Sequence, residues 1–472
     1  MKTTFINRVS ELAWLESCYK KADDSGQLLI IYGKRRVGKT ELVTQFLRGK
    51  PSIYYVANRT TKIEQLASAT QVFSTGLGDT FMAPAGLASW RDFFDYLIQK
   101  VENRKDAEPL VLVFDEYPYL AESEAGISSF FQYGWDMGLK DQRVLLIVMG
   151  SSIAMMQKHA LVKSAPLYGR RTGQWLVEPF GFTETQNFYP NSSFENSFSL
   201  YAISGGIPAY ASIFDGQKSL KDNILTYIFP EGSYLSIEPE LLLSDDFADP
   251  RTYVSILQAI GLGRTKFSQI LQNSGMPASA LPVYLQNLQA LKLIKRETPV
   301  TDALRFNSKN STYSLSDMFL RFYFSFILPN SSLIKSKAYE AVFKTKGEVL
   351  RQLVAKSYED ATGEFVREAT KIGVLPHFEL MGRWWDKETE IDLVGLNQET
   401  NSIFFVETKW SNKLVGVEVL LDLKEKSKRV GWGKTGRTEY FGLVSKNGFS
   451  QELKSLAKKK GVVLIEENRV MV

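Results

Sequence analysis

Leu28-Leu29-Ile30-Ile31-Tyr32-Gly33-Lys34-Arg35-Arg36-Val37-Gly38-Lys39-Thr40 is the stretch that decides the fold. Its first five residues are apolar or aromatic and predict a short buried strand of a parallel sheet. The next eight match the P-loop pattern Gly-x-x-x-x-Gly-Lys-Thr, and a helix is expected to start at Glu41. In this motif the backbone N–H groups and the helix N-terminus face a phosphate group. The stretch therefore predicts a nucleotide site in a parallel α/β domain.

The residue types of the P-loop have separate expected tasks. Lys39 would supply a point charge to the β- and γ-phosphates, and the hydroxyl of Thr40 would ligate Mg²⁺. The expected nucleotide-binding run is Gly33, Lys34, Arg35, Arg36, Val37, Gly38, Lys39, Thr40 and Glu41. ATP and Mg²⁺ are the cofactors that this run predicts.

A second apolar run ends in two acidic residues. Residues 110–114 are followed by Asp115 and Glu116, a Walker B pattern that would bring Asp115 to the Mg²⁺ shell and Glu116 to the attacking water. Acids at this place can instead cap the next helix, but the distance from the P-loop favours the catalytic role. A third apolar run, 144–150, precedes Ser151, which could sense the γ-phosphate or serve as a helix N-cap.

Two arginines lie in a glycine-flanked loop at residues 166–173. Arg170 and Arg171 could complete an ATPase site, either in the same chain or in a neighbouring copy. Ion pairs at the surface or between domains are an equally good interpretation.

The composition is that of an ordinary globular protein with several domains. The chain has 472 residues, of which 44% are hydrophobic and 23% charged, and it has no apolar run long enough to cross a membrane. The only cysteine, Cys18, excludes an internal disulfide and fits a cytoplasmic location. With only His159 and His377 available, a catalytic metal should bind to carboxylates. The net charge of +5 permits nucleic-acid binding without requiring it.

The C-terminal region carries a second set of candidate catalytic residues. Period-two patterning places Glu390 and Asp392 on one face of a strand, and Glu407 and Lys409 on one face of the next. Glu359, on a preceding helix, could add a ligand. Carboxylates from paired strands and a lysine can bind a divalent cation, activate water and stabilise a phosphodiester transition state. The alternative is that these charged residues simply face solvent.

The expected architecture is α/β, with a parallel-sheet P-loop domain, a helical lid, a winged helix-turn-helix and a C-terminal α/β domain. Helices at 267–271 and 281–291, followed by a strand from Leu293, indicate the winged helix. The second of these helices has few basic residues, so DNA binding and protein contacts are equally supported. A linker is expected at 330–332. The expected domain ranges are 1–180, 181–245, 246–330 and 345–472.

Further motifs follow a recognisable order along the chain. They are Phe5-x-Asn7-Arg8, Asp115-Glu116-Tyr117-Pro118, Gly150-Ser151-Ser152, Gly169-Arg170-Arg171, Gly205-Gly206-Ile207-Pro208, Glu390-Ile391-Asp392-Leu393 and Glu407-Thr408-Lys409-Trp410. With the P-loop, they resemble the archaeal-type ATPases at the border of the AAA+ and STAND groups. In that family a winged helix and a C-terminal domain of the PD-(D/E)XK nuclease-like (restriction-endonuclease-like) fold follow the ATPase domain.

The resemblance implies roles for individual residues. It places Asn7 and Arg8 near the adenine and makes Ser151 sensor-like. Its implied hydrolytic site is Lys39, Thr40, Asp115 and Glu116, and its implied nuclease set is Glu359, Asp392, Glu407 and Lys409.

Two functional hypotheses follow. The first is an ATP-hydrolysing switch that controls a metal-dependent nuclease domain acting on nucleic acid, with DNA favoured. The rival is a nucleotide-dependent regulatory or scaffold protein whose C-terminal fold binds nucleic acid or a protein partner without cutting. Both are compatible with self-oligomerisation. Convergence of Asp392, Glu407 and Lys409 on a metal-sized pocket would favour the nuclease, and carboxylates engaged in ion pairs would favour the rival.

Overall fold

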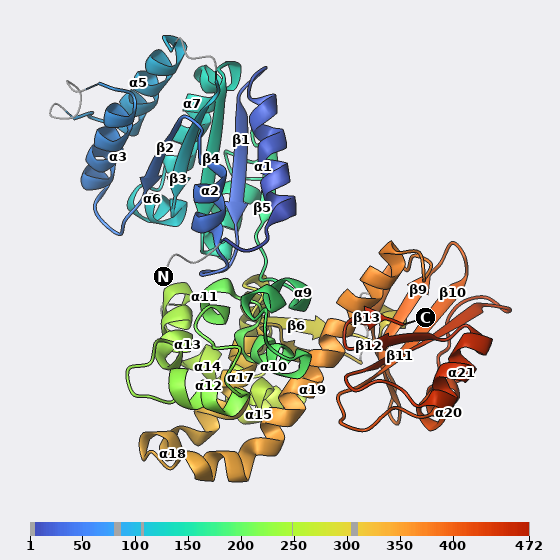
Figure 1. Ribbon diagram of the computed structural model, residues 1–472. Coiled ribbons are helices and arrows are strands. Elements are labelled where there is room, and N and C mark those ends of the chain that lie inside the picture. The colour runs from blue at the N-terminus through green and yellow to red at the C-terminus, as the bar shows by residue number, and fades with distance from the viewer. Residues whose placement is uncertain (1–4, 80–85, 105–107, 248, 304–309, 472) are drawn as a thin grey trace. The chain divides into compact units, whose positions relative to one another are not determined.

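The computed structural model of the chain describes residues 5–79, 86–104, 108–247, 249–303 and 310–471 (Figure 1). The chain divides into two compact units. Unit 1 holds Met1–Pro179 and the short segment Ile207–Ala209, here called the strap. Unit 2 holds Phe180–Gly206 and Tyr210–Val472. The chain therefore passes between the units at three places.

Unit 1 is built on a five-stranded sheet with the strand order β2-β3-β4-β1-β5 (Figure 1). Its strands are β1 (Gln27–Tyr32), β2 (Ser52–Val56), β3 (Leu110–Asp115), β4 (Val144–Gly150) and β5 (Gly173–Leu176). Every pair of neighbours runs parallel. The parallel α/β fold predicted around the P-loop is therefore confirmed.

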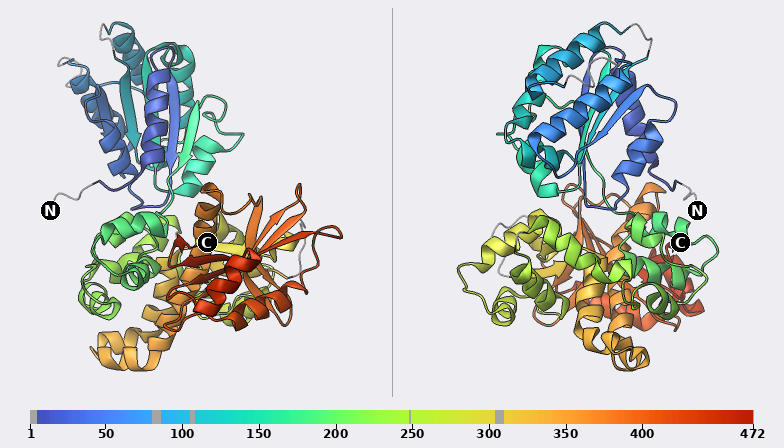
Figure 2. Two further views of the ribbon diagram at one scale, coloured as in Figure 1. Left: turned by 45° about the vertical axis from the view of Figure 1, so that its right-hand side comes forward. Right: turned by 90° about the vertical axis from the view of Figure 1, so that its left-hand side faces the viewer.

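Helices cover both faces of this sheet, as Figure 2 shows. Leu28 and Ile30 of β1 point into one core, whereas Leu29 and Ile31 point into the other. Burial on both faces explains why the strands read as continuous apolar runs. On the face of Leu29 and Ile31, the helices α1 (Val9–Lys21) and α2 (Lys39–Phe46) pack against the sheet. On the face of Leu28 and Ile30, the packing helices are α3 (Lys62–Gly76), α5 (Trp90–Glu102), α6 (Tyr117–Ser123) and α7 (Ile127–Met137). A short helix, α8 (Ile153–Met156), follows β4.

Unit 2 begins with a group of helices. They are α9 (Phe182–Thr185), α10 (Phe194–Ser204), α12 (Leu220–Tyr227) and α13 (Tyr234–Asp246), while α11 (Pro208–Ala211) begins in the strap. Serine side chains cap two of them, because Ser193 accepts from the N–H of Asn196 and Ser219 accepts from that of Asp222. Residues 181–245 are thus mainly helical, as predicted, and their role as a lid stays a prediction.

The next segment contains three helices and a two-stranded antiparallel sheet. Its elements are α14 (Arg251–Gly261), α15 (Phe267–Ser274), α16 (Leu281–Ala290), β6 (Ile294–Glu297) and β7 (Thr312–Leu315). These bounds agree with the two helices and the strand expected from the sequence. The assignment as a winged helix stays a prediction.

Two expected boundaries are wrong. Residues 330–332, predicted as a linker, are helical: Asn330 is buried and donates to the carbonyl oxygen of Phe326, and α18 (Ser331–Lys335) follows directly. The domain start expected near 345 falls inside one continuous helix, α19 (Tyr339–Lys371). The buried side chains of α19 run from Val342 to Ala369, and a continuous apolar face gives the helix no reason to break. Helix α17 (Met318–Phe322) precedes both.

The C-terminal part of unit 2 is a mixed six-stranded sheet with the order β13-β12-β11-β10-β9-β8. Strand β11 pairs in parallel with β10 and β12, and the other pairs are antiparallel. Its strands are β8 (Leu380–Trp385), β9 (Glu390–Asn397), β10 (Ser402–Lys409), β11 (Thr438–Ser445), β12 (Val463–Glu466) and β13 (Arg469–Val470). The helices α20 (Val417–Ser427) and α21 (Gln451–Lys460) share a core with the sheet.

This sheet confirms the α/β character expected for the C-terminal region, and its nuclease-like identity stays a prediction. Among the residues that the structure describes, no helix combines the length and the apolar character needed to span a bilayer.

Gly206 provides a test of the packing where the chain leaves unit 2. Gly206 and Gly275 have nearly equal φ angles of 68° and 67°. A Cβ on Gly206 would lie 1.9 Å from the carbonyl oxygen of Phe180, whereas a Cβ on Gly275 would meet nothing within 4 Å. We expect Gly275→Ala to lower the free energy of unfolding by about 1 kcal/mol. Gly206→Ala should lower it by at least about 2 kcal/mol more. Urea unfolding followed by circular dichroism measures both, and equal losses would contradict the close approach.

Candidate functional site

The P-loop joins β1 to α2 and needs glycine at two positions. Gly33 and Gly38 have φ angles of 157° and 89°. A Cβ on Gly33 would lie 2.3 Å from the carbonyl oxygen of Val177, so only glycine permits this approach to the segment after β5. A Cβ on Gly38 would lie 3.9 Å from Cγ of Pro208. The P-loop therefore packs closely on the segment after β5, and Pro208 of the strap lies near Gly38.

The ammonium group of Lys39 lies inside the P-loop. It donates hydrogen bonds of 2.9 Å to the carbonyl oxygens of Gly33 and Lys34. Burial lowers the pKa of Lys39 to about 8, although the negative charges of Glu116 and Asp115 oppose that change. A phosphate anion would supply opposite charge to this ammonium group at close range. The loop therefore fits a nucleotide phosphate.

Asp115 at the end of β3 is 3% exposed and its carboxylate accepts three hydrogen bonds. Oδ2 accepts from the hydroxyls of Tyr54 at 2.6 Å and Thr40 at 3.1 Å, and Oδ1 accepts from the N–H of Glu116 at 2.8 Å. The adjacent hydroxyl and carboxylate oxygens of Thr40 and Asp115 are ligands that suit Mg²⁺. Burial and the charge of Asp115 raise the pKa of Tyr54, so its phenol keeps the proton that it donates.

Glu116 lies beside Ser151. The hydroxyl of Ser151 donates to the Glu116 carboxylate, with oxygen–oxygen distances of 2.8 and 3.1 Å. Glu116 has a φ of 53°, an uncommon conformation for a residue with a side chain. Helix α8 is capped by Ser152, which accepts from the N–H of Met155. The helix-cap interpretation of Ser151 is therefore wrong, and Ser151 instead contacts the expected catalytic glutamate.

Arg8 lies outside the P-loop and is hydrogen-bonded to it. Its guanidinium is 6% exposed, and Nη2 donates to the carbonyl oxygens of Val37 at 2.7 Å and Glu178 at 2.9 Å. Nη1 pairs with Glu11 at 2.8 Å. Asn7 and Arg8 both have positive φ angles, 57° and 61°. The observed contacts of Arg8 are structural, and the placement of both residues near an adenine stays a prediction.

The other expected nucleotide-binding residues lie around the loop. Arg35 donates to the hydroxyl of Tyr119 at 2.9 Å. Lys34 and Arg36 are half-buried, and Arg36 has a φ of 67°. Glu41 is exposed in the first turn of α2.

Arg170 and Arg171 both have partners within unit 1. Nε of Arg170 donates to both carboxylate oxygens of Asp136, at 3.0 and 2.9 Å. The guanidinium of Arg171 lies 4.4 Å from the ring centroid of Tyr168. The ion-pair interpretation of Arg170 is the one that these contacts favour, and a role for either residue in trans stays a prediction.

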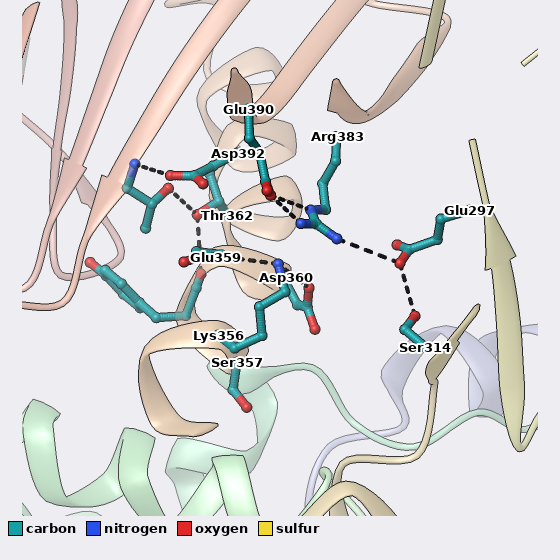
Figure 3. A network of polar contacts seen from close by, with 12 residues as sticks. Glu297, Ser314, Lys356, Ser357, Glu359, Asp360, Thr362, Arg383, Glu390 and Asp392 are labelled. Atoms are coloured by element: carbon teal, nitrogen blue, oxygen red, sulfur yellow. Dashed lines mark hydrogen bonds and ion pairs between the residues drawn. The ribbon is translucent and has the colours of Figure 1, made fainter. Parts of the chain in front are cut away.

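In unit 2, three expected carboxylates line one cavity of about 990 Å³. Glu359 comes from α19 and Asp392 from β9 (Figure 3). Glu407 comes from β10. Each is held by the protein itself. Glu359 pairs with Lys356 at 2.7 Å, and Asp392 accepts from the N–H of Thr408 at 2.8 Å.

Glu407 contacts two lysines. Its Oε1 lies 2.7 Å from Lys409 Nζ and 3.1 Å from Lys426 Nζ. Its Oε2 is buried without a hydrogen-bond partner in the part of the chain that is described. Across that same part, no group of three or more His, Cys, Asp or Glu side chains is arranged to hold a metal ion. The predicted carboxylates thus share a cavity but are not assembled as a metal cluster.

The pKa of Asp392 depends on the neighbouring carboxylates. Burial, followed by the charges of Glu359 and Glu407, raises the pKa of Asp392 to about 7. Three carboxylates in one cavity repel one another, which favours the protonated form of Asp392. A divalent cation would reverse this effect by favouring the charged form.

Glu390 was predicted on the same face as Asp392, but it contacts a different group. It pairs with Arg383 on β8, whose Nη1 also lies 3.8 Å from Glu297 Oε2 on β6 (Figure 3). Ser314 on β7 donates to that Glu297 oxygen at 2.8 Å. A chain of polar contacts therefore joins the two-stranded sheet to the rim of the carboxylate cavity.

Sequence reasoning missed three residues of these sites. Tyr54, Lys356 and Arg383 all contact an expected site residue or its neighbour. Lys356 could have been found, because it precedes Glu359 by three positions on a predicted helix. The other two meet their partners only through strand packing.

Comparison with known proteins places two family matches on the chain. A family described as an ATPase domain predominantly from Archaea matches residues 5–212. A family described as archaeal and bacterial proteins of unknown function matches residues 323–429. The chain thus contains an ATPase domain of this family, matched over residues 5–212.

Individual proteins match as well. An uncharacterized protein of Methanocaldococcus jannaschii is 31% identical over 456 residues, which cover 95% of this chain and 97% of that protein. An uncharacterized ATP-binding protein of the same organism is 48% identical over 46 residues, covering 10% of this chain and 75% of its own. A Walker-type ATPase of Pyrococcus abyssi has a similar fold, with a TM-score of 0.52 at 21% identity over 68% of this chain and 97% of that chain.

Lys39→Ala should reduce ATP turnover by at least about 100-fold, because the ammonium group that would stabilise the transferring phosphate is lost. Turnover is measured as phosphate released at saturating ATP. Lys50→Ala is the control, since Lys50 pairs with Glu16 and with the end of α2 away from the loop. Unchanged turnover in Lys39→Ala would contradict the P-loop assignment.

The stability of unit 2 should depend on pH through Asp392. Its pKa of about 7 in the folded chain lies above the ordinary 3.8, so the folded state binds this proton more tightly. The stability from that proton is fully present below pH 4 and is lost as the pH rises through 7. Between pH 4 and pH 8, the free energy of unfolding should therefore fall by roughly 2–4 kcal/mol less in Asp392→Asn than in the wild type.

Urea unfolding of both proteins across this pH range measures the difference. Glu425→Gln is the matched control, because Glu425 lines the same cavity but is 70% exposed. Parallel pH profiles for the wild type and Asp392→Asn would contradict the raised pKa.

Proposed function

Since the chain belongs to the archaeal-type ATPase family, we propose that ATP hydrolysis in unit 1 works as a switch for a nuclease-like site in unit 2. The proposed substrate of that site is nucleic acid, with DNA favoured. The observation that carries the proposal is the shared cavity of Glu359, Asp392 and Glu407, with Lys409 bound to Glu407.

In the proposed hydrolytic site, each residue of unit 1 has a separate role. Lys39 binds the β- and γ-phosphates, while Thr40 and Asp115 hold Mg²⁺, which would neutralise phosphate charge when bound. Glu116 orients the attacking water. The hydroxyl of Ser151 lies 2.8 Å from the Glu116 carboxylate, so it is well placed to fix the direction of that carboxylate.

The proposed coupling follows the chain out of unit 1. Arg8 links the carbonyl oxygen of Val37 in the P-loop to that of Glu178, and Pro208 in the strap lies near Gly38. Glu178 and Pro208 each lie within two positions of a passage into unit 2. A nucleotide that reshapes the P-loop would therefore change the surroundings of both passages.

Inside unit 2, hydrogen bonds connect the residues that follow the first passage with those that precede the second. The N–H of Phe180 donates to the carbonyl oxygen of Gly206 at 2.8 Å. The N–H groups of Phe182 and Thr183 both donate to the carboxylate of Glu364 at 3.0 Å. Glu364 lies on α19, little more than one helical turn after Glu359. This continuity supports a route from the nucleotide to the carboxylate cavity.

In the proposed second site, a divalent cation held by Glu359, Asp392 and Glu407 would activate water and polarise a phosphodiester. Oxygen-only ligands suit Mg²⁺ or Mn²⁺, and the buried Oε2 of Glu407 is available as such a ligand. Lys409 and Lys426 would leave Glu407 and turn to the phosphate oxygens. The ammonium groups would thereby stabilise the charge that develops during cleavage.

Nucleic-acid binding is proposed from two further features. The elements α14, α15, α16, β6 and β7 have the order of a winged helix-turn-helix, and Arg383 connects β6 to Glu390 at the cavity rim. The basic stretch Lys424–Arg429 lies along one side of the cavity and could follow a phosphate backbone. Self-association, which would bring Arg170 or Arg171 to a neighbouring site, belongs to the same proposal.

A second candidate function is a nucleotide-dependent regulator or scaffold that binds nucleic acid or protein without cutting it. The ion pairs of Glu359 with Lys356, and of Glu407 with Lys409 and Lys426, favour this candidate. So does the lack of an assembled metal cluster among the described residues. Both candidates share the ATPase, and they differ in the chemistry of unit 2.

Cleavage assays separate the two candidates. Single- and double-stranded DNA and RNA are incubated with Mg²⁺ or Mn²⁺, with and without ATP. The nuclease proposal expects cutting by the wild type and a loss of at least about 100-fold in Lys409→Ala, because a charge that stabilises the transition state is removed. It also expects Lys39→Ala to cut without responding to ATP.

Lys413→Ala is the matched control, since Lys413 is an exposed lysine in the loop after β10. Cutting that survives in Lys409→Ala would place the nuclease activity elsewhere. If no substrate is cut under any condition, and the chain still binds nucleic acid or a protein in an ATP-dependent way, the regulator is the better description.

A further inference from the structure

We infer that Tyr54 is a positioning residue of the ATPase site, whose phenol O–H fixes the Asp115 carboxylate in the orientation that Mg²⁺ requires. Tyr54 lies on β2, outside both the P-loop and the acidic end of β3. The inference rests on the proposed Mg²⁺ site at Thr40 and Asp115.

The hydrogen bonds around Asp115 define what Tyr54 does. The Tyr54 oxygen lies 2.6 Å from Oδ2, the shortest of the three hydrogen bonds that the carboxylate accepts. The N–H of Glu116 holds Oδ1, and the hydroxyl of Thr40 is the other donor to Oδ2. Since Thr40 would turn its hydroxyl oxygen to Mg²⁺, Tyr54 would be the donor that stays on Oδ2. Loss of that donor would leave the carboxylate held at Oδ1 alone, by the N–H of Glu116, and so less firmly oriented about its terminal bond.

The sheet gives Tyr54 a fixed position. Strand β2 pairs in parallel with β3, so that Val56 lies opposite Asp115 and Tyr54 lies opposite Val113. The ring of Tyr54 packs on the core under α2, which begins with Lys39 and Thr40. The phenol is therefore held between the strand that carries Asp115 and the helix that carries Thr40.

Tyr55 provides a matched control on the same strand. It points to the opposite face of the sheet, into the other core, and its hydroxyl bonds to the side chain of Gln65 at 2.5 Å. Tyr54→Phe and Tyr55→Phe each remove one hydroxyl of β2 that is hydrogen-bonded to another side chain. Only Tyr54→Phe removes a contact with Asp115.

The test measures how much Mg²⁺ strengthens ATP binding. ATP affinity is determined by calorimetry with excess Mg²⁺ and with EDTA, and the ratio of the two dissociation constants reports the coupling of metal and nucleotide. Residues that orient metal ligands typically contribute 10–100-fold to metal affinity or activity. We therefore expect the coupling ratio to fall about tenfold or more in Tyr54→Phe. Affinity in EDTA should stay unchanged, and Tyr55→Phe should match the wild type in both.

Phosphate release measured against free Mg²⁺ is the second readout. In Tyr54→Phe the Mg²⁺ concentration for half-maximal rate should rise by a similar factor. A coupling ratio in Tyr54→Phe equal to that of the wild type would overturn the inference, as would equal changes in Tyr54→Phe and Tyr55→Phe. If the wild type itself shows no effect of Mg²⁺ on ATP binding, the proposed metal site fails and this inference fails with it.

Discussion

The buried guanidinium of Arg8 is the interaction on which the nucleotide site depends. Its two hydrogen bonds from Nη2 join the carbonyl oxygen of Val37 in the P-loop to that of Glu178, although Arg8 is 170 positions away from Glu178 in the chain. A charged group this deeply buried is stable only when several acceptors surround it. The loop conformation, the end of the sheet domain and the start of α1 are consequently fixed together. A displacement of the Val37 carbonyl would therefore disturb the guanidinium that also binds Glu178 and Glu11.

In both candidate sites a charged group already has partners in this structure. Lys39 donates to two carbonyl oxygens inside its own loop, and Glu407 pairs with two lysines. A ligand must therefore compete with contacts that already exist, and its net affinity is the difference between new and old interactions. A phosphate would have to replace the carbonyl oxygens at Lys39, and the proposed divalent cation would have to displace the lysines at Glu407.

Prediction from the sequence worked where the determinants are local. The pattern from Gly33 to Thr40 specifies a loop between a strand and a helix, and the acids after residue 114 follow a run that only a buried strand explains. Tyr54 could not be recognised, because its partner Asp115 is 61 positions away and meets it only after β2 and β3 pair. For Asp392 and Glu407, the faces of the strands were predictable, but their ion-pair partners were not. Lys426 reaches Glu407 from α20, whose position on the sheet no local pattern encodes. The boundary expected near 345 was wrong for a related reason: the apolar face of α19 continues because it packs on different elements along its length.

The strap makes unit 1 discontinuous in the sequence. Only three residues, Ile207–Ala209, belong to unit 1 between two stretches of unit 2. Since an extended chain spans roughly 3.5 Å per residue, the strap itself can span no more than about 10 Å. A fragment that ends at Pro179 would lack the strap, and a fragment long enough to include it would carry a piece of unit 2. Neither unit can therefore be produced whole by cutting the chain at a single place.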